Sequence, residues 1–199
     1  MRPSFLLIIS GAPGAGKTTL ARQLARKLNL PLVAKDDIKE ALFDSLGWKD
    51  RAWSKQLGRA TYELMYYFVE QQLAVGRSLI VESNFDSAHA SPRFRAIQDK
   101  HPFAPIQIIL NADGNVLVER FKTRWASGAR HPGHVDHLSA PEEIEKLRDH
   151  RYAPLDLGGA VIEMDTTNFA TVDYAELFGM LKGYLDSSVY AVAPKAETR

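Results

Sequence analysis

Residues 5–18 read FLLIISGAPGAGKT and combine a short apolar run with a glycine-rich turn that ends in lysine and threonine. Residues 11–18 match the pattern G-x-x-x-x-G-K-[ST] at every fixed position. The apolar run before them is typical of a strand buried on both faces of a parallel sheet. Residues 17–28 carry leucines spaced four apart, which predicts a helix. Together, the strand, the turn and the helix predict a loop that binds the phosphates of a nucleotide.

The residue types in this turn suit phosphate binding. Glycines let backbone N–H groups turn inward toward phosphate oxygens, where side chains would obstruct them. The side chain of Lys17 can reach the β- and γ-phosphates, and the Thr18 hydroxyl can ligate Mg²⁺. We therefore expect ATP and Mg²⁺ as ligands. The expected nucleotide-binding residues of the turn are Gly11, Ala12, Pro13, Gly14, Ala15, Gly16, Lys17, Thr18 and Thr19.

The rest of the chain alternates short apolar runs with helical patterns, which predicts an α/β fold with three α/β/α layers and a five-stranded parallel sheet. We expect one domain over residues 1–188, a small lid at about 126–140 within it, and a flexible tail at 189–199. The further strands are predicted at 31–34, 78–81, 106–110 and 161–164, and the further helices at 38–46, 51–75, 92–100, 115–125, 141–151 and 174–184.

The composition limits the classes of protein to consider. The chain has 199 residues, of which 45% are hydrophobic, and a formal net charge of +1, so it can build a real core and does not favour nucleic acid or a membrane as partner. It has no cysteine, which excludes disulfides and thiolate metal sites. The apolar run at 5–9 is too short for a signal sequence or a membrane span. We therefore expect a cytoplasmic protein, either monomeric or homodimeric.

Polar side chains follow the predicted strands at the sheet edge where ligands bind in open α/β folds. Asp36 and Asp37 follow the second strand, and either could accept the proton of a hydroxyl acceptor, or both could only cap the next helix. Glu82 ends the third strand and could hold a Mg²⁺-bound water. Asn84 and Asp86 could line an acceptor pocket, although loop polarity explains them equally well. The expected acceptor-binding residues are Asp36, Asp37, Lys39 and Asn84.

Residues 127–140 read SGARHPGHVDHLSA and predict an exposed loop. Arg120 and Arg124 lie four residues apart on the preceding predicted helix, and Arg130 lies in the loop. Arginines on a closing loop stabilise the charge that spreads over the γ-phosphoryl oxygens during transfer, and closure excludes water. We interpret this region as a lid in which Arg124 and Arg130 act in catalysis. The three histidines of the loop lack the spacing of a zinc site.

These motifs resemble the P-loop kinases of the nucleoside-monophosphate-kinase-like superfamily. More narrowly, the chain resembles the AAA-domain ATPase/kinase group, which is similar to polynucleotide 5′-kinases, chloramphenicol phosphotransferase and zeta-toxin kinases. The resemblance runs from Phe5 to about Tyr184. It implies that Asp36, the first aspartate of the pair, is the general base.

The resemblance also implies roles for residues around the nucleotide. Lid arginines of such kinases contact adenine and phosphates, which corresponds to Arg120, Arg124 and Arg130 here. The loop after the last strand borders the adenine in these kinases, which corresponds to Thr167 and Asn168.

The function that these residues and the resemblance imply is a kinase that uses ATP and Mg²⁺ to phosphorylate a hydroxyl of a small molecule. Nucleoside monophosphate kinases usually carry Asp-Gly where this chain has Glu82-Ser83, which argues against an AMP-type acceptor. The alternatives are a polynucleotide 5′-hydroxyl kinase, which the near-zero net charge disfavours, a kinase toxin, and a regulatory ATPase that signals its nucleotide state to a partner.

Overall fold

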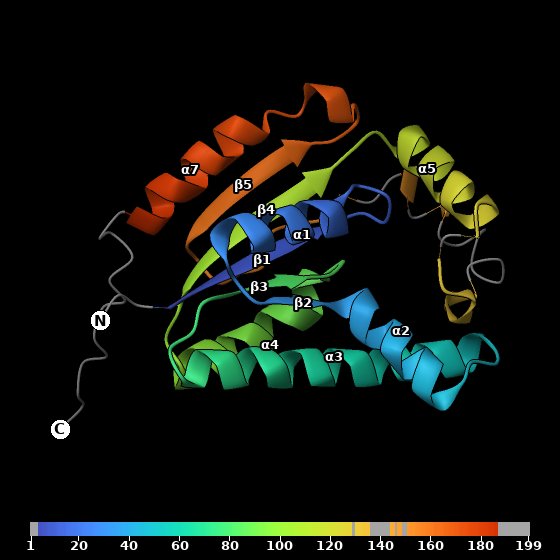
Figure 1. Ribbon diagram of the computed structural model, residues 1–199, viewed down its shortest axis with the longest axis horizontal. Helices are drawn as coiled ribbons and strands as arrows, with labels where there is room; N and C mark the ends of the chain where they lie inside the picture. Colours follow the sequence, from blue (N-terminus) through green and yellow to red (C-terminus); the bar gives the residue numbers. More distant parts are fainter. Residues whose placement is uncertain (1–3, 129, 136–143, 146, 149–150, 187–199) are drawn as a thin grey trace.

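The computed structural model describes residues 4–128, 130–135, 144–145, 147–148 and 151–186. Its five strands form one parallel sheet in the order β2-β3-β1-β4-β5, with helices on both faces (Figure 1), which confirms the predicted three-layer α/β fold. The strands are β1 (Phe5–Gly11), β2 (Leu32–Ala34), β3 (Leu79–Glu82), β4 (Ala104–Asn111) and β5 (Ala160–Asp165). The helices are α1 (Lys17–Leu28), α2 (Lys35–Leu46), α3 (Arg51–Ala74), α4 (Ser87–Lys100), α5 (Gly114–Ala126) and α7 (Tyr174–Asp186), with 3-10 turns η1 (Pro132–His134) and η2 (Phe169–Thr171).

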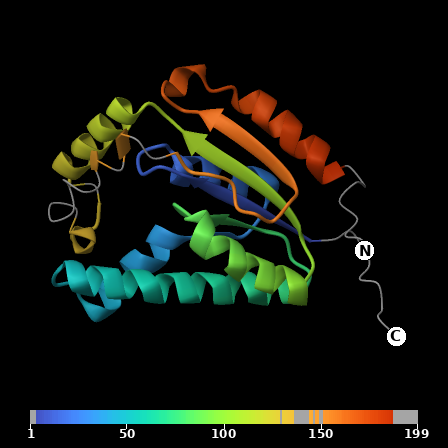
Figure 2. The same ribbon diagram turned by 180° about the vertical axis from the view of Figure 1, so that it is seen from behind.

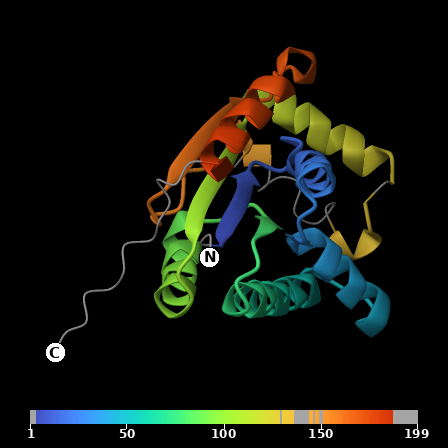
Figure 3. The same ribbon diagram turned by 60° about the vertical axis from the view of Figure 1, so that its left-hand side comes forward.

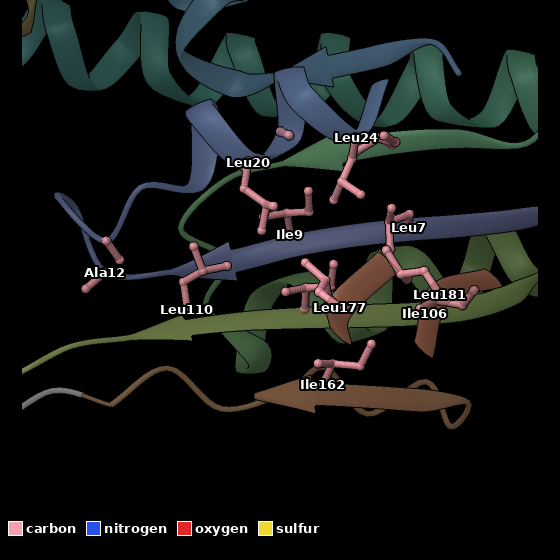
Figure 4. Packing of buried hydrophobic residues seen from close by; sticks show 14 of the residues in the cluster. Leu7, Ile9, Ala12, Leu20, Leu24, Ile106, Leu110, Ile162, Leu177 and Leu181 are labelled. Atoms are coloured by element: carbon pink, nitrogen blue, oxygen red, sulfur yellow. The ribbon is translucent and has the colours of Figure 1, made fainter. Parts of the chain in front are cut away.

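The central strand β1 separates two hydrophobic cores. Leu6 and Ile8 pack in the core beneath α3 and α4, whereas Leu7 and Ile9 pack in the core beneath α1, α5 and α7. Successive side chains of a strand point to opposite faces, so an uninterrupted apolar run fills both cores at once. Figure 4 shows leucines of α1 pointing toward β1, and Figures 2 and 3 show the sheet between the two helical layers. This double burial fixes where the strand ends and the glycine-rich turn begins.

The register between β1 and β4 places Gly11 opposite Leu110. Gly11 has φ of 137°, and a Cβ on it would lie 2.1 Å from the carbonyl oxygen of Leu110. The first glycine of the motif is therefore required by strand pairing. Gly16 has φ of 90° and precedes α1, and its Cβ would lie 2.8 Å from the Phe169 ring. Both positions exclude side chains because the protein's own atoms already fill the space that a Cβ would need.

Two helices begin earlier than the sequence predicts. α2 starts at Lys35 after Ala34, so Asp36 and Asp37 occupy its first turn, and the prediction that they cap it is wrong. α4 starts at Ser87 because the Asp86 carboxylate accepts a hydrogen bond from the Ala88 N–H at 2.9 Å. Pro92 consequently lies inside α4 instead of opening it.

The predicted exposed loop after α5 is only partly exposed. Gly133 and His134 of η1 are buried, because they pack against the Phe43 ring of α2. Residue 129, residues 136–140 of the predicted lid, most of the predicted helix 141–151, and the predicted tail 189–199 lie outside the described residues. Among the helices that the structure describes, none is both long and apolar enough to cross a membrane.

We expect Gly11→Ala to destabilise the fold by about 2–4 kcal/mol, because it adds backbone strain to a clash with Leu110 that neither strand can relieve. Gly76→Ala is the matched control. Gly76 also has positive φ, 72°, but no atom lies within 4 Å of a Cβ there, so we expect a loss of about 1 kcal/mol. Urea unfolding followed by circular dichroism measures both, and equal losses would contradict the role of the β1–β4 register.

Candidate active site

A cavity of about 520 Å³ lies at the carboxyl ends of the strands. Its walls come from the glycine-rich turn, α2, the first turns of α3, the end of β3, α5, η1 and Phe169. In Figure 1 these elements gather at the end of the sheet toward which the strand arrows point. This is the edge where open α/β sheets bind ligands, so the location agrees with the expectation from the sequence.

The end of the glycine-rich turn supplies a cation and a hydroxyl, and the end of β3 supplies a carboxylate beside them. Lys17 is 9% exposed, and its Nζ donates a hydrogen bond to the Ala12 carbonyl at 2.9 Å. Burial lowers the pKa of Lys17 to about 8, and the Glu82 carboxylate opposes that shift. Thr18 Oγ1 donates to Glu82 Oε2 at 3.0 Å. A hydroxyl and a carboxylate side by side are a donor set that suits Mg²⁺.

Glu82 lies at the end of β3 and is 4% exposed. Burial raises the pKa of this carboxyl, while the nearby Lys17 ammonium and the Thr18 hydroxyl lower it. A bound cation would favour the ionised form further. The described residues contain no cluster of three or more histidine or carboxylate side chains that could hold a metal alone. A metal at Thr18 and Glu82 therefore needs oxygens from the nucleotide as well, which fits Mg²⁺ that enters with ATP.

The structure separates the two aspartates of α2. Asp36 lines the cavity, where Lys35 Nζ donates to its Oδ1 at 2.9 Å and Arg130 to its Oδ2 at 3.0 Å. Burial alone would raise the pKa of Asp36, but Lys35 and Arg130 together hold it well below its usual value. Asp37 instead binds Arg22 of α1 at 2.9 Å, is half-exposed, and is absent from the cavity lining. Of the two candidate bases, Asp36 alone faces the cavity.

The arginines predicted for the lid are held by contacts with different elements. Arg120 NH2 donates to the carbonyls of Thr166 and Thr167 at 2.8 and 2.9 Å, and its guanidinium carbon lies 3.9 Å above the Phe169 ring. Arg124 also lines the cavity. Burial is the main cause of the lowered pKa of Lys17, and the positive charge of Arg124 lowers that pKa further. The stacked Arg120 and Phe169 form one wall beside the glycine-rich turn.

The loop after β5 contributes differently than the resemblance implies. Thr167 Oγ1 accepts from the Asp113 N–H at 2.8 Å, and Asn168 Oδ1 accepts from the Ala170 N–H at 3.0 Å. Neither residue belongs to the cavity lining, whereas Phe169 next to them does. The sequence gives no signal for Phe169 beyond its place after the last strand, because an aromatic residue there is equally compatible with core packing.

The His-Pro-Gly-His segment packs against α2. The His131 ring stacks on Phe43 with centroids 5.2 Å apart, and His134 meets the same ring edge-on at 5.4 Å. A Cβ on Gly133 would lie 2.6 Å from Phe43, so the backbone touches the ring directly. His134 Nε2 lies 3.0 Å from Glu40 Oε1. This packing holds Arg130 against the first turn of α2.

The remaining wall carries residues expected for an acceptor and others that the sequence analysis missed. Asn84 and Lys39 line the cavity as expected, while Asp86 serves as the cap of α4. Arg51 and Lys55 also line it and were missed. Their spacing of four residues at the start of a helix was the available signal, but such a pair usually marks a solvated face.

Comparisons with known proteins agree with this geometry. The sequence pattern of a family described as AAA domain matches residues 6–154. A protein of Pyrococcus furiosus, provisionally described as an adenylate kinase, is 30% identical over 162 residues, which are 81% of this chain and 75% of that protein. A cytidylate kinase of Pyrobaculum calidifontis is 26% identical over 169 residues, or 84% of this chain and 80% of the relative.

Solved structures described as kinases also align with this chain. The crystal structure of a protein of Chloroflexus aurantiacus, provisionally described as a kinase, aligns with a TM-score of 0.87 and 42% identity and covers 92% of this chain and 99% of its own. A sugar kinase of Janibacter aligns with a TM-score of 0.55 at 15% identity over 94% of this chain and 96% of its own, which shows the fold alone. The relatives thus include kinases whose described acceptors differ.

We expect the stability of the protein to fall as the pH drops from 7 to 5. Burial, aided by Arg130, lowers the pKa of His134 to about 3, whereas an unfolded histidine titrates near its ordinary value of 6.5. Between these values the unfolded chain binds one more proton than the folded chain. The free energy of unfolding therefore decreases by up to about 1.4 kcal/mol per pH unit below pH 6.5.

Urea unfolding between pH 5 and 8 measures this dependence. We expect His134→Gln to flatten it, because the substitution removes the buried imidazole. Equal slopes in the wild type and in His134→Gln would show that His134 is not buried in the neutral form.

Proposed function

This chain belongs to the AAA domain family, and we propose that it is a kinase that transfers the γ-phosphoryl group of ATP to a hydroxyl of a small molecule. The observation that carries the proposal is the ionised Asp36 carboxylate in the same cavity as the Lys17 turn. Hydrolysis by water alone needs no acceptor pocket with its own base. The kinases among the relatives support phosphoryl transfer as the reaction type.

ATP enters with its phosphates in the glycine-rich turn. The N–H groups of the turn and the N-terminus of α1 face the phosphate oxygens, and Lys17 exchanges its bond to Ala12 for a bond to the β- and γ-phosphates. Arg120 and Phe169 border the turn on the side of α5, where they support the rest of the nucleotide. Thr18 and, directly or through water, Glu82 would hold Mg²⁺, which would supply positive charge to offset that of the nucleotide phosphates.

Transfer then needs a positioned acceptor and a place for its proton. The acceptor hydroxyl oxygen forms a bond to the γ-phosphorus, the bond from that phosphorus to the β,γ-bridging oxygen breaks, and ADP leaves. Asp36 Oδ accepts the hydroxyl proton as that bond forms, since the hydroxyl becomes acidic only in the transition state. Arg124 and Arg130 line the same cavity, which supports the proposal that they stabilise the charge on the transferred group.

A nucleoside monophosphate is the second candidate acceptor, because relatives described as adenylate and cytidylate kinases match most of the chain. In that reaction the attacking group is a phosphate oxygen, which is ionised at neutral pH and needs no base. The kinetic effect of removing the Asp36 carboxylate therefore distinguishes the two acceptors.

We expect Asp36→Asn to lower kcat for a hydroxyl acceptor by about 10²- to 10⁴-fold while the Kd for ATP stays close to wild type. Asp37→Asn is the matched control, because Asp37 pairs with Arg22 outside the cavity, and its kcat should stay close to that of the wild type. Incubation with ATP, Mg²⁺ and a library of hydroxyl metabolites, followed by mass spectrometry of the products, identifies the acceptor for these measurements.

Two outcomes would contradict the proposal. If a product forms equally fast with Asp36→Asn, Asp36 is not the general base, and a phosphate acceptor is favoured. If the protein binds ATP tightly but no acceptor changes the rate of ADP release, a regulatory ATPase is favoured.

We expect Glu82→Gln to raise the Mg²⁺ concentration for half-maximal rate about tenfold or more, because the amide keeps the shape and the bond to Thr18 but loses the charge. Thr18→Ser keeps the hydroxyl and should retain nearly the wild-type dependence. Titration of the rate with Mg²⁺ at saturating ATP measures both. An unchanged midpoint in Glu82→Gln would place the metal elsewhere.

A further inference from the structure

The segment that follows β3 lies at the same sheet edge as Asp36. Strands β2 and β3 are parallel, and their register places Ala34 opposite Glu82. Asp36 and Asn84 each follow this pair by two residues, and both line the cavity. Neighbouring strands of a sheet lie about 4.8 Å apart. Asn84 therefore borders the same part of the cavity as the proposed base.

Hydrogen bonds to the end of β1 hold Asn84 from both sides. The Ser83 N–H donates to the Ile9 carbonyl at 3.2 Å, and the Phe85 N–H donates to Ser10 Oγ at 3.2 Å. Ser83, Phe85 and Ser10 are each no more than 2% exposed. Because the glycine-rich turn begins directly after Ser10, these bonds fix the backbone of Asn84 relative to the phosphate-binding turn.

Two hydroxyl groups set the direction of the Asn84 amide. Ser83 Oγ donates to Asn84 Oδ1 at 3.4 Å, and it lies 3.0 Å from the hydroxyl oxygen of Tyr62 on α3. A serine hydroxyl has one proton, so Tyr62 is the donor in the second bond. The Tyr62 ring packs against Tyr66 and Phe85, with ring centroids 6.2 and 6.5 Å away. Donation therefore runs from Tyr62 through Ser83 to the carbonyl oxygen of Asn84.

The amide nitrogen of Asn84 is left for a ligand. In the part of the chain that the structure describes, Nδ2 of Asn84 donates to no protein group. This nitrogen is not buried either, so a molecule in the cavity can reach it. Its two N–H groups can donate hydrogen bonds but cannot accept them. Asn84 thus presents donors to the cavity, whereas the Asp36 carboxylate presents acceptors.

These two side chains place opposite hydrogen-bonding requirements on an acceptor. Asp36 takes the hydroxyl that reacts, and Asn84 needs a lone pair on a second atom. Two hydroxyls on neighbouring carbons meet both requirements, because one donates to Asp36 while the other accepts from Asn84. A compound with a single hydroxyl would bind Asp36 and displace water from the Asn84 amide without replacing that hydrogen bond.

We propose, on the basis of the kinase function proposed above, that the acceptor is a polyhydroxy compound, a sugar or a polyol. In this proposal Asn84 Nδ2 donates to the hydroxyl beside the one that is phosphorylated. Asn84 is then a residue that determines specificity, and Ser83 and Tyr62 are positioning residues that act through it.

Tyr62 lies outside the cavity lining, so its effect on the acceptor passes through Ser83. A hydroxyl can both donate and accept. Without the proton that Tyr62 supplies, Ser83 Oγ can accept from Asn84 Nδ2 instead of donating to Oδ1. The amide then turns over and presents its carbonyl oxygen to the cavity. Loss of the Tyr62 hydroxyl should therefore weaken the recognition of the second hydroxyl while the ring packing is retained.

A turnover experiment tests the role of Asn84. Glycerol, ribose and glucose, each beside its monodeoxy analogues, are supplied separately with ATP and Mg²⁺, and so is any polyhydroxy compound that the metabolite library identifies. For the analogue that lacks the neighbouring hydroxyl, we expect kcat/KM to be about 10- to 100-fold lower than for the parent compound. In Asn84→Leu this difference should disappear, because leucine has a similar size but no donor. The KM for ATP should stay close to wild type.

Two further variants test the direction of the amide. Asn84→Asp keeps an oxygen for the Ser83 hydroxyl but puts an oxygen in place of the donating nitrogen, so kcat/KM for the parent compound should fall about 10- to 100-fold. Tyr62→Phe should reduce the preference for the parent compound over its analogue, with the urea midpoint of unfolding close to wild type. Tyr67→Phe is the control, because Tyr67 is exposed on α3 outside the lining.

The contrary outcomes are distinguishable. If the wild type does not discriminate against any analogue that keeps the reactive hydroxyl, or if Asn84→Leu discriminates as the wild type does, the role of Asn84 is overturned. A rise in the KM for ATP in place of that for the acceptor would assign Asn84 to the nucleotide and also overturn it. A wild-type preference in Tyr62→Phe would overturn the positioning role.

The library separates this inference from the kinase function. Products from compounds with a single hydroxyl only would overturn the polyhydroxy acceptor and leave the kinase function standing. No product from any compound, with ATP still bound, would count against the kinase function itself, and the inference would fall with it.

Discussion

Burial of β1 on both faces holds the cavity at the sheet edge in place. Because Leu6 and Ile8 fill one core and Leu7 and Ile9 fill the other, the strand cannot slide or rotate without emptying both. Its end is therefore fixed against β4, and the glycine-rich turn begins where Gly11 meets Leu110. The neighbouring strands β2 and β3 end at the same edge, which brings the residues after them within reach of one ligand.

Ion pairs and hydrogen bonds then fix the side chains that lie at this edge of the sheet. Asp36 joins α2 to the segment after α5 through Arg130, and Glu82 joins β3 to the turn through Thr18. The pKa values of these two carboxyl groups shift in opposite directions because their surroundings differ: flanking cations lower the pKa of Asp36, whereas burial raises the pKa of Glu82. One cavity thus holds a carboxylate that its cations keep ionised beside a buried one whose ionised form a bound cation would favour.

The sequence predicted the parts of this arrangement that local patterns determine. The strand, the turn and the helix of residues 5–28 have strict local requirements, and Asp36 and Glu82 follow predicted strands. The residues alone, without the resemblance, could not tell Asp36 from Asp37, because contacts with other elements separate them: Asp36 binds Arg130 at the cavity, and Asp37 binds Arg22 on a neighbouring helix. Phe169 and Arg51 were missed for a similar reason: their places depend on tertiary contacts between elements far apart in the chain.

The packing around Phe43 joins the segment from Arg130 to His134 to the first turns of α2. The His131 ring stacks on Phe43, the His134 ring meets it edge-on, and the Gly133 backbone touches it. Arg130, which precedes His131, binds Asp36. Separation of η1 from α2 would break these contacts together, because none of them can be lost while the others keep their geometry. A movement of η1 away from α2 would therefore cost the ring contacts and the ion pair between Asp36 and Arg130 together.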